Sequence, residues 1–167
     1  MSKLIEVLME EHQEILKFTQ AMETMCLELM EHNRFSEQEF RDAIVFIRQT
    51  ADRNHHQKEE RLLFKVMTEE LGTVAINLVQ HGMIVEHDQA RLFVSELEQA
   101  VTRYAANPNA TDKLWILANA MSYCAHLRRH IEKEDNAVYP FAARALSAES
   151  LAKLDEAFAA EQAGQQR

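Results

Sequence analysis

Apolar residues recur every three to four positions along most of the chain, which is the period of one buried helical face. In the first stretch this stripe reads Leu4, Leu8, Ile15, Met22, Cys26 and Leu29. The pattern predicts long helices over about 2–31, from 36 to about 70, from the Leu71-Gly72-Thr73 break to about 104, and from 111 or 112 towards Pro140. Because the chain holds only three glycines and two prolines, we expect an all-α protein.

The connections between these helices are short, and short connections make consecutive helices antiparallel neighbours. Ser36-Glu-Gln-Glu39 is a capping box that opens the second helix, and Pro140 should end or kink the fourth. We therefore predict an up-down antiparallel four-helix bundle, in a single domain over residues 1–160. Ser147 can cap a short C-terminal helix, and residues 161–167 are expected to form a disordered tail.

The chain contains an internal repeat. When the sequence is shifted by 75 positions, Glu11-His12 falls on Glu86-His87, and residues 55–64 fall on residues 130–139. The matched polar residues of the longer run are His55, Lys58 and Glu59 in the first copy and His130, Lys133 and Glu134 in the second. The first predicted helix thus pairs with the third, and the second with the fourth. The bundle is expected to be a duplicated helical hairpin.

The repeated polar residues lie on the apolar faces of their helices. A histidine and a glutamate four positions apart share a helical face, so each hairpin should turn two histidines and one glutamate inward. A buried carboxylate is costly without a cationic partner, and these faces offer neither lysine nor arginine at the right place. A metal ion would supply the missing charge. The residues predicted to hold it are His12, His55, Glu59, His87, His130 and Glu134.

The ligand types narrow the choice of metal. Imidazole with carboxylate suits iron, zinc or manganese, and no set of thiolates favours a structural zinc site. Six inward ligands exceed what one tetrahedral zinc ion takes, and two symmetric carboxylates can bridge two ions, so we predict a binuclear centre. A ferritin-like site would need Glu-x-x-His units, but no histidine of this chain has glutamate three residues before it.

This pattern resembles the hemerythrin-like, or HHE, cation-binding domain. The resemblance covers about residues 2–145 and rests on Glu11-His12, His55-His-Gln-Lys-Glu59, Glu86-His87 and His130-Ile-Glu-Lys-Glu134. It implies two non-haem iron ions between four helices, with an open position for dioxygen or another small ligand. It also implies the ligand roles, with His12, His55, His87 and His130 as terminal ligands and Glu59 and Glu134 as bridges.

The chain departs from the oxygen-carrying members of that family, which use a fifth histidine four positions from the one on the third helix. Here Met83 and Arg91 occupy the positions four before and four after His87. His56 is the first candidate for the missing nitrogen, because some iron-sensing relatives use this position. Pairing of His56 with Glu60 is an equally weighted alternative.

Other residues near the motif leave further alternatives open. His126 lies one turn before His130 and could be a ligand or a supporting residue, and water could fill the same position. Asp135 competes with Glu134 as the bridge, although the repeat favours Glu134. His81 and His32 are expected at the surface.

Composition excludes several classes of partner. The formal net charge is −9, whereas binding to duplex nucleic acid needs a cationic face. No uncharged run reaches the roughly twenty residues of a membrane-spanning helix, and the amino terminus does not resemble a signal peptide. We therefore expect a cytoplasmic protein with no membrane or nucleic-acid partner. Cys26 and Cys124 are expected to be buried free thiols.

Two classes of function fit the predicted centre. In the first, the protein reversibly binds dioxygen or nitric oxide, for transport, storage or sensing. In the second, it is an enzyme or iron-handling protein that reduces nitric oxide or peroxide or delivers iron, since a missing fifth histidine leaves coordination open to exchange. A histidine network that binds zinc or no metal is a third interpretation. The reductase is unknown, and the sequence leaves open whether the chain forms a homodimer.

Overall fold

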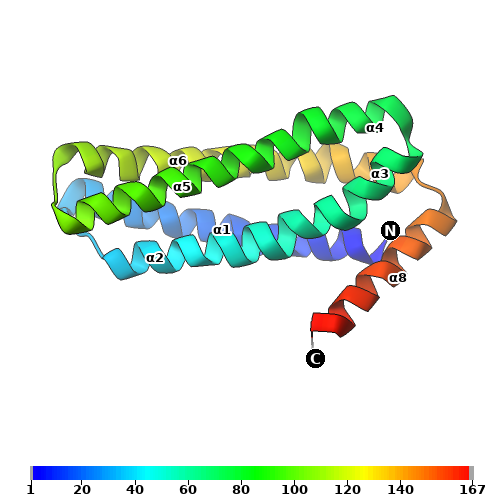
Figure 1. Cartoon of the computed structure of the whole chain (residues 1–167), viewed down its shortest axis with the longest axis horizontal. Helices are drawn as coiled ribbons and strands as arrows, with labels where there is room; N and C mark the ends of the chain where they lie inside the picture. The colour runs from blue at the N-terminus through cyan, green and yellow to red at the C-terminus, as the bar shows by residue number, and fades with distance from the viewer. Residues whose placement is uncertain (1, 166–167) are drawn as a thin grey trace.

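The computed structural model describes residues 2–165, and all regular secondary structure in this range is helical (Figure 1). The first helix is α1 (Lys3–His32). The second helical run comprises α2 (Glu37–Phe46), η1 (Ile47–His56), η2 (Glu59–Leu63) and α3 (Phe64–Glu70). The third run comprises α4 (Gly72–Leu78), η3 (Val79–Met83) and α5 (Ile84–Ala106). The fourth comprises α6 (Ala110–Lys133), η4 (Glu134–Val138) and α7 (Tyr139–Ala145), and α8 (Ala148–Gln165) follows it.

The ends of the helical runs follow from local side-chain chemistry. The Ser36 hydroxyl accepts a hydrogen bond from the backbone N–H of Glu39 at 3.3 Å, as predicted for the start of α2. Gly72, with φ of 68°, stands at the break between α3 and α4. The fourth run begins slightly earlier than predicted, because the side chain of Asn109 caps α6 by accepting from the N–H of Asp112 at 2.9 Å.

The segments η1 to η4 are π-helical, which the sequence did not indicate. Their backbone N–H groups bond to the carbonyl five residues earlier, as in Gln57 to Asp52 and Tyr139 to Glu134. Pro140 does not end or visibly break the fourth run, which continues to Ala145. It lies in the first turn of α7, directly after the π-helical segment η4.

The apolar core is divided into two clusters, and the predicted metal ligands lie between them. One cluster, which includes Ile15, Ala51 and Ala90, fills one part of the bundle. The other, which includes Leu8 and Leu62, fills the part beside α8. Helix α1 packs against α6 and η1, and α5 packs against α6 and α2. Side chains from all four helical runs meet at this level of the bundle.

Helix α8 crosses the end of the molecule where the chain begins (Figure 1). The carboxylate of Asp155 accepts hydrogen bonds from the Ser2 hydroxyl at 2.5 Å and from the N–H groups of Lys3 and Leu4 at 2.9 and 3.0 Å. The helix continues past Glu161, where we expected the tail to begin, so residues 161–165 are helical. Residues 166 and 167 of the expected tail lie outside the described residues.

Two further expectations concern the cysteines and membrane-spanning helices. Cys26 and Cys124 are both buried and form no disulfide. In the part of the chain that the structure describes, none of the helices combines the length and the apolar character needed to cross a membrane.

Candidate metal centre

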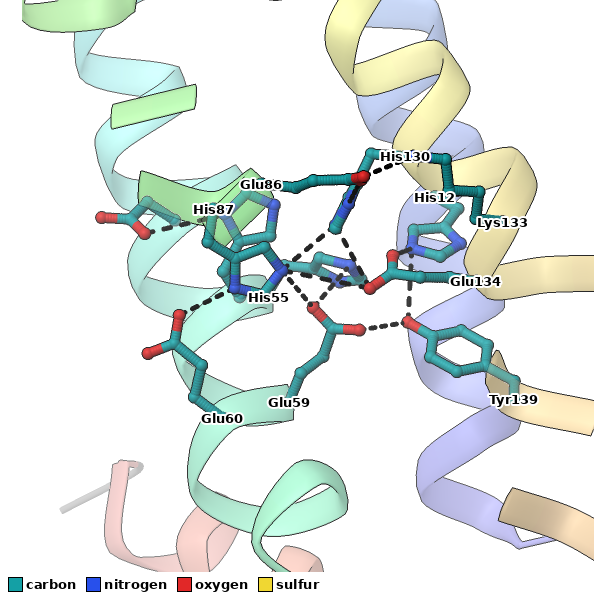
Figure 2. Close-up of polar contacts among 12 residues, drawn as sticks. His12, His55, Glu59, Glu60, Glu86, His87, His130, Lys133, Glu134 and Tyr139 are labelled. Carbon is teal, nitrogen blue, oxygen red and sulfur yellow. Dashed lines mark hydrogen bonds and ion pairs between the residues drawn. The ribbon is translucent and has the colours of Figure 1, made fainter. Parts of the chain in front are cut away.

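Six buried side chains from the four helical runs point toward one another at the level between the two core clusters (Figure 2). They are His12, His55, Glu59, His87, His130 and Glu134, each at most 1% exposed. Groups of their ligand atoms lie within 4.8 Å of one another, in one set of Glu59, His87, His130 and Glu134 and another of His12, His55 and Glu134. The structure thus brings together the residues that the repeat singled out.

The two glutamates lie among the inward ring nitrogens of the histidines. The Oε2 atom of Glu134 is 3.2 Å from Nε2 of His12, and its Oε1 atom is 3.2 Å from Nε2 of His130. Oε2 of Glu59 is 3.6 Å from Nε2 of His87. Two ligands that are each about 2.0–2.2 Å from one ion lie roughly 3 Å apart. These spacings therefore fit ligands arranged around shared ions.

Each of the four histidines has a carboxylate at its outer ring nitrogen. The Nδ1 atoms of His12, His55, His87 and His130 lie 2.7, 2.9, 2.8 and 2.8 Å from oxygens of Asp135, Glu11, Glu60 and Glu86, respectively. A carboxylate there favours the tautomer with hydrogen on Nδ1 and leaves the lone pair of Nε2 free. The same second layer of contacts orients the histidine ligands of known metal sites.

These supporting contacts follow the internal repeat. Lys58 pairs with Glu11, and Lys133 pairs with Glu86, at positions 75 apart in both cases. The carboxylates that support the histidines of α1 and α5 come from the opposite copy of the repeat, so the two hairpins complete each other. Glu11 and Glu86 were used above only to align the repeat, and their matched positions were the signal that could have identified this role.

Several polar atoms at the centre lack hydrogen-bond partners, and they supply a test of whether a metal fits. Within the described range, Nε2 of His55, Oε2 of Glu59 and both carboxylate oxygens of Glu134 are buried and unpaired by hydrogen bonds. Unpaired buried charges are costly, and these donor atoms are the ones that metal ions in oxygen- and nitrogen-rich sites bind. The residues present therefore fit a bound metal.

Without metal, protons would supply part of the positive charge that the centre requires. Burial and the neighbouring Glu134 raise the pKa of Glu59 well above its ordinary value. Although burial opposes it, Glu134 and Glu86 raise the pKa of His130 to about 9. Burial also opposes protonation of His12, but Asp135 and Glu134 raise its pKa. A metal must displace such protons in order to bind.

His56 lies beside the centre. Its ring stacks on that of His87, with centroids 4.0 Å apart and an interplanar angle of 11°, and its ligand atoms group with those of His87 and His130. The expected alternative, pairing with Glu60, is wrong, because Glu60 instead accepts hydrogen bonds from His87 and Arg91. The nearest carboxylate to His56 belongs to Asp52, 3.7 Å from Nδ1.

The remaining alternatives are also located. Nε2 of His126 donates to the backbone carbonyl of Glu86 at 2.8 Å, which favours a supporting role over ligation. Asp135 contacts His12 Nδ1 and so belongs to the supporting layer. His81 and His32 are exposed, as expected.

Tyr139 is a polar member of the centre that the sequence analysis did not single out. Its hydroxyl donates to Oε1 of Glu59 at 2.6 Å and lies 3.3 Å from Nε2 of His12. The repeat contained a signal for this difference, because Tyr139 matches Phe64, which has no hydroxyl. Phe64 is buried with its ring near that of His87.

The comparison with protein families agrees with this site. Residues 3–142 match the hemerythrin HHE cation-binding domain, which is most of the chain. The chain therefore belongs to the hemerythrin HHE cation-binding domain family. A search of curated proteins found no match.

Proposed function

We propose that this chain is a non-haem di-iron protein that binds a small ligand, dioxygen or nitric oxide, within an up-down four-helix bundle. The proposed metal ligands are His12, His55, His56, Glu59, His87, His130 and Glu134. The observation that carries the proposal is the shared orientation of four buried histidines, whose Nδ1 atoms meet carboxylates and whose Nε2 atoms face the two buried glutamates.

Iron is preferred over zinc and manganese because of the number and kind of ligands. Five histidines and two carboxylates exceed the four ligands of a tetrahedral zinc site. The excess of imidazole over carboxylate argues against manganese, which favours oxygen ligands. When bound, a pair of iron ions with seven protein ligands would supply an open coordination position that a small molecule can occupy.

The residues of the chain prepare the site for that ligand. Glu134 turns one oxygen toward His12 and the other toward His130. Glu59 turns its Oε2 atom toward His87, and its Oε1 atom accepts a hydrogen bond from Tyr139. Apolar clusters on both sides exclude water. The position of His56 supports a fifth nitrogen ligand. The enzymatic alternative depended on the absence of one, so it loses that support.

Two further parts of the proposal concern the setting of the protein. Cys26 and Cys124 are buried free thiols, which supports a location in a reducing compartment, the cytoplasm. A reductase is a further proposed partner, because iron that becomes oxidised without releasing its ligand needs electrons to return to the ferrous state.

Metal analysis and absorption spectra of the purified protein test the proposal. We expect about two irons per chain, and a spectrum that changes on anaerobic reduction and changes again, reversibly, when dioxygen or nitric oxide is added. One zinc ion per chain, or no metal, would contradict the iron centre. Two irons that oxidise at once, with no stable adduct, would favour the enzymatic or iron-handling alternative.

A further inference from the structure

A cavity of about 80 Å³ lies beside the candidate metal centre, between η1, α5 and α6. Part of its wall is apolar and is formed by Ile47, Ala90 and Val94. Its deeper end is formed by His56 and Tyr123, which are both at most 2% exposed. The cavity therefore reaches His56, one of the proposed metal ligands, from between η1, α5 and α6.

The buried end carries polar atoms that nothing in the protein satisfies. The Tyr123 hydroxyl has no hydrogen-bond partner among residues 2–164, although an unsatisfied buried hydroxyl is costly. Both ring nitrogens of His56 are likewise buried without a hydrogen bond in this part of the chain. Burial raises the pKa of Tyr123 well above its ordinary value, so its hydroxyl remains a donor. A ligand in the cavity would find a hydrogen-bond donor beside the centre.

The outer end of the cavity is formed by charged residues that are already paired. Arg48 binds Glu98 through two hydrogen bonds of 2.9 and 2.6 Å. Arg91 binds Asp52 at 2.7 Å and also pairs with Glu60 and Asp88. Both arginines are partly exposed, so the cavity lies between the surface and His56.

Size and charge together identify the class of molecule that the cavity suits. Its volume is far below the roughly 300–1,000 Å³ of pockets for drug-sized ligands. Because each arginine is matched by carboxylates, the cavity offers no spare positive charge to an anion. An apolar wall with one hydroxyl donor is suited to a neutral molecule of two or three atoms.

We propose that this cavity is the route by which a small neutral ligand reaches the metal centre, and that the Tyr123 hydroxyl donates a hydrogen bond to it there. The inference rests on the proposed function for its destination. The shape of the cavity belongs to the polypeptide itself and can be tested without metal.

Xenon, which binds in apolar cavities, tests the cavity in the metal-free protein. We expect a crystal under xenon pressure to show one xenon atom between Ala90 and Tyr123. Ala90→Leu and Val94→Phe, which fill the cavity from different positions, should each abolish that xenon. Ala157→Leu, on the exposed side of α8, is the matched control and should retain it. An empty cavity in the parent protein under xenon would overturn the inference.

Ligand-binding rates then test the route. In iron-loaded protein, Ala90→Leu should slow association of nitric oxide at least tenfold, whereas Ala157→Leu should leave it unchanged. Tyr123→Phe should speed dissociation of the ligand by roughly threefold to tenfold, as expected for the loss of one neutral hydrogen bond. Helix content and iron content are measured for each variant. If they show that Ala90→Leu fails to fold, Val94→Phe, which fills the same cavity, replaces it.

The two proposals fail in different ways. A parent protein that takes up no iron overturns the proposed function, and with it the destination of the route. A parent and an Ala90→Leu variant that hold two irons each, and that bind nitric oxide at the same rate, overturn only the route.

Discussion

Glu134 is a buried residue whose two oxygens face histidines from different helices. Oε2 lies toward His12 and Oε1 toward His130, each at 3.2 Å. Asp135, the next residue, carries the same charge but contacts the outer nitrogen of His12. One step along the chain therefore separates a proposed bridging ligand from a supporting residue.

Removal of a proposed ligand is expected to prevent assembly of the centre. Glu134→Ala should abolish binding of both ions, because it removes a side chain whose separate oxygens reach His12 and His130. His55→Ala should also abolish binuclear loading, since it removes an inward Nε2 atom. Metal content after reconstitution measures the effect. The control is His32→Ala, at an exposed position, which should load normally. Two irons per chain in both site variants would show that the assignment is wrong.

Metal affinity should increase with pH. In the metal-free protein at neutral pH, His130, with a pKa of about 9, holds a proton that the metal must displace. Burial and the neighbouring Glu134 raise the pKa of Glu59, which favours retention of a second proton there. Raising the pH removes these protons in advance. Each displaced proton should strengthen apparent binding about tenfold per pH unit, up to about pH 9. Competition with a coloured chelator of known proton affinity measures this slope. A flat profile between about pH 6 and pH 9 would contradict proton displacement.

At the scale of helices, the periodic pattern predicted the elements well because each long helix has one apolar face. The inward residues could be found for the same reason, since histidine and glutamate interrupt apolar stripes at matched positions. The π-helical segments could not be predicted. A shift from four to five residues between bonded groups depends on how neighbouring helices pack, and a single stripe does not record it. These segments nevertheless contain His55, Glu59 and Glu134.

Contacts between distant parts of the chain explain most of what the sequence did not indicate. The outer carboxylates Glu60 and Asp135 occupy matched positions of the repeat, but the sequence did not show which histidine each one supports. Glu60 supports a histidine of α5, and Asp135 supports one of α1, so each contact crosses between the two copies. The hydroxyl of Tyr139 was visible in the sequence, but its acceptor on Glu59 depends on the packing of two helical runs. The length of α8 was underestimated because its end carries no apolar stripe, while Arg61 pairs with Glu161 across the bundle.

Helix α8 should stabilise the start of α1 through Asp155. The carboxylate takes up two backbone N–H groups that otherwise lack partners at a helix start. Asp155→Ala should lower the free energy of unfolding by about 1 kcal/mol, the usual cost of losing a helix cap. Urea unfolding, followed by helix content, measures the change. Glu156→Ala is the matched control at the adjacent exposed position. Equal unfolding midpoints for the two variants would contradict the role of Asp155.

At the scale of the whole molecule, the metal centre connects parts of the core that apolar packing leaves separate. The two apolar clusters meet at a layer of histidines and glutamates. In the metal-free protein this layer contains unpaired buried polar atoms, which weaken the contact between the clusters. A bound metal would satisfy these atoms from all four helical runs at once, so its contribution to stability should be global.

Chelation should therefore lower the melting temperature of the entire bundle in one cooperative transition. A ligand that binds only the folded state stabilises it by about 4 kcal/mol when its free concentration is 1,000 times the Kd. For a chain of this size that corresponds to a shift on the order of 10 °C. Differential scanning calorimetry of loaded protein, with and without chelator, measures it. The Glu134→Ala variant should melt at the same temperature in both conditions. If loaded parent protein also melts identically in both, the metal does not join the two clusters, and the histidine layer must be stabilised by its own protons and hydrogen bonds.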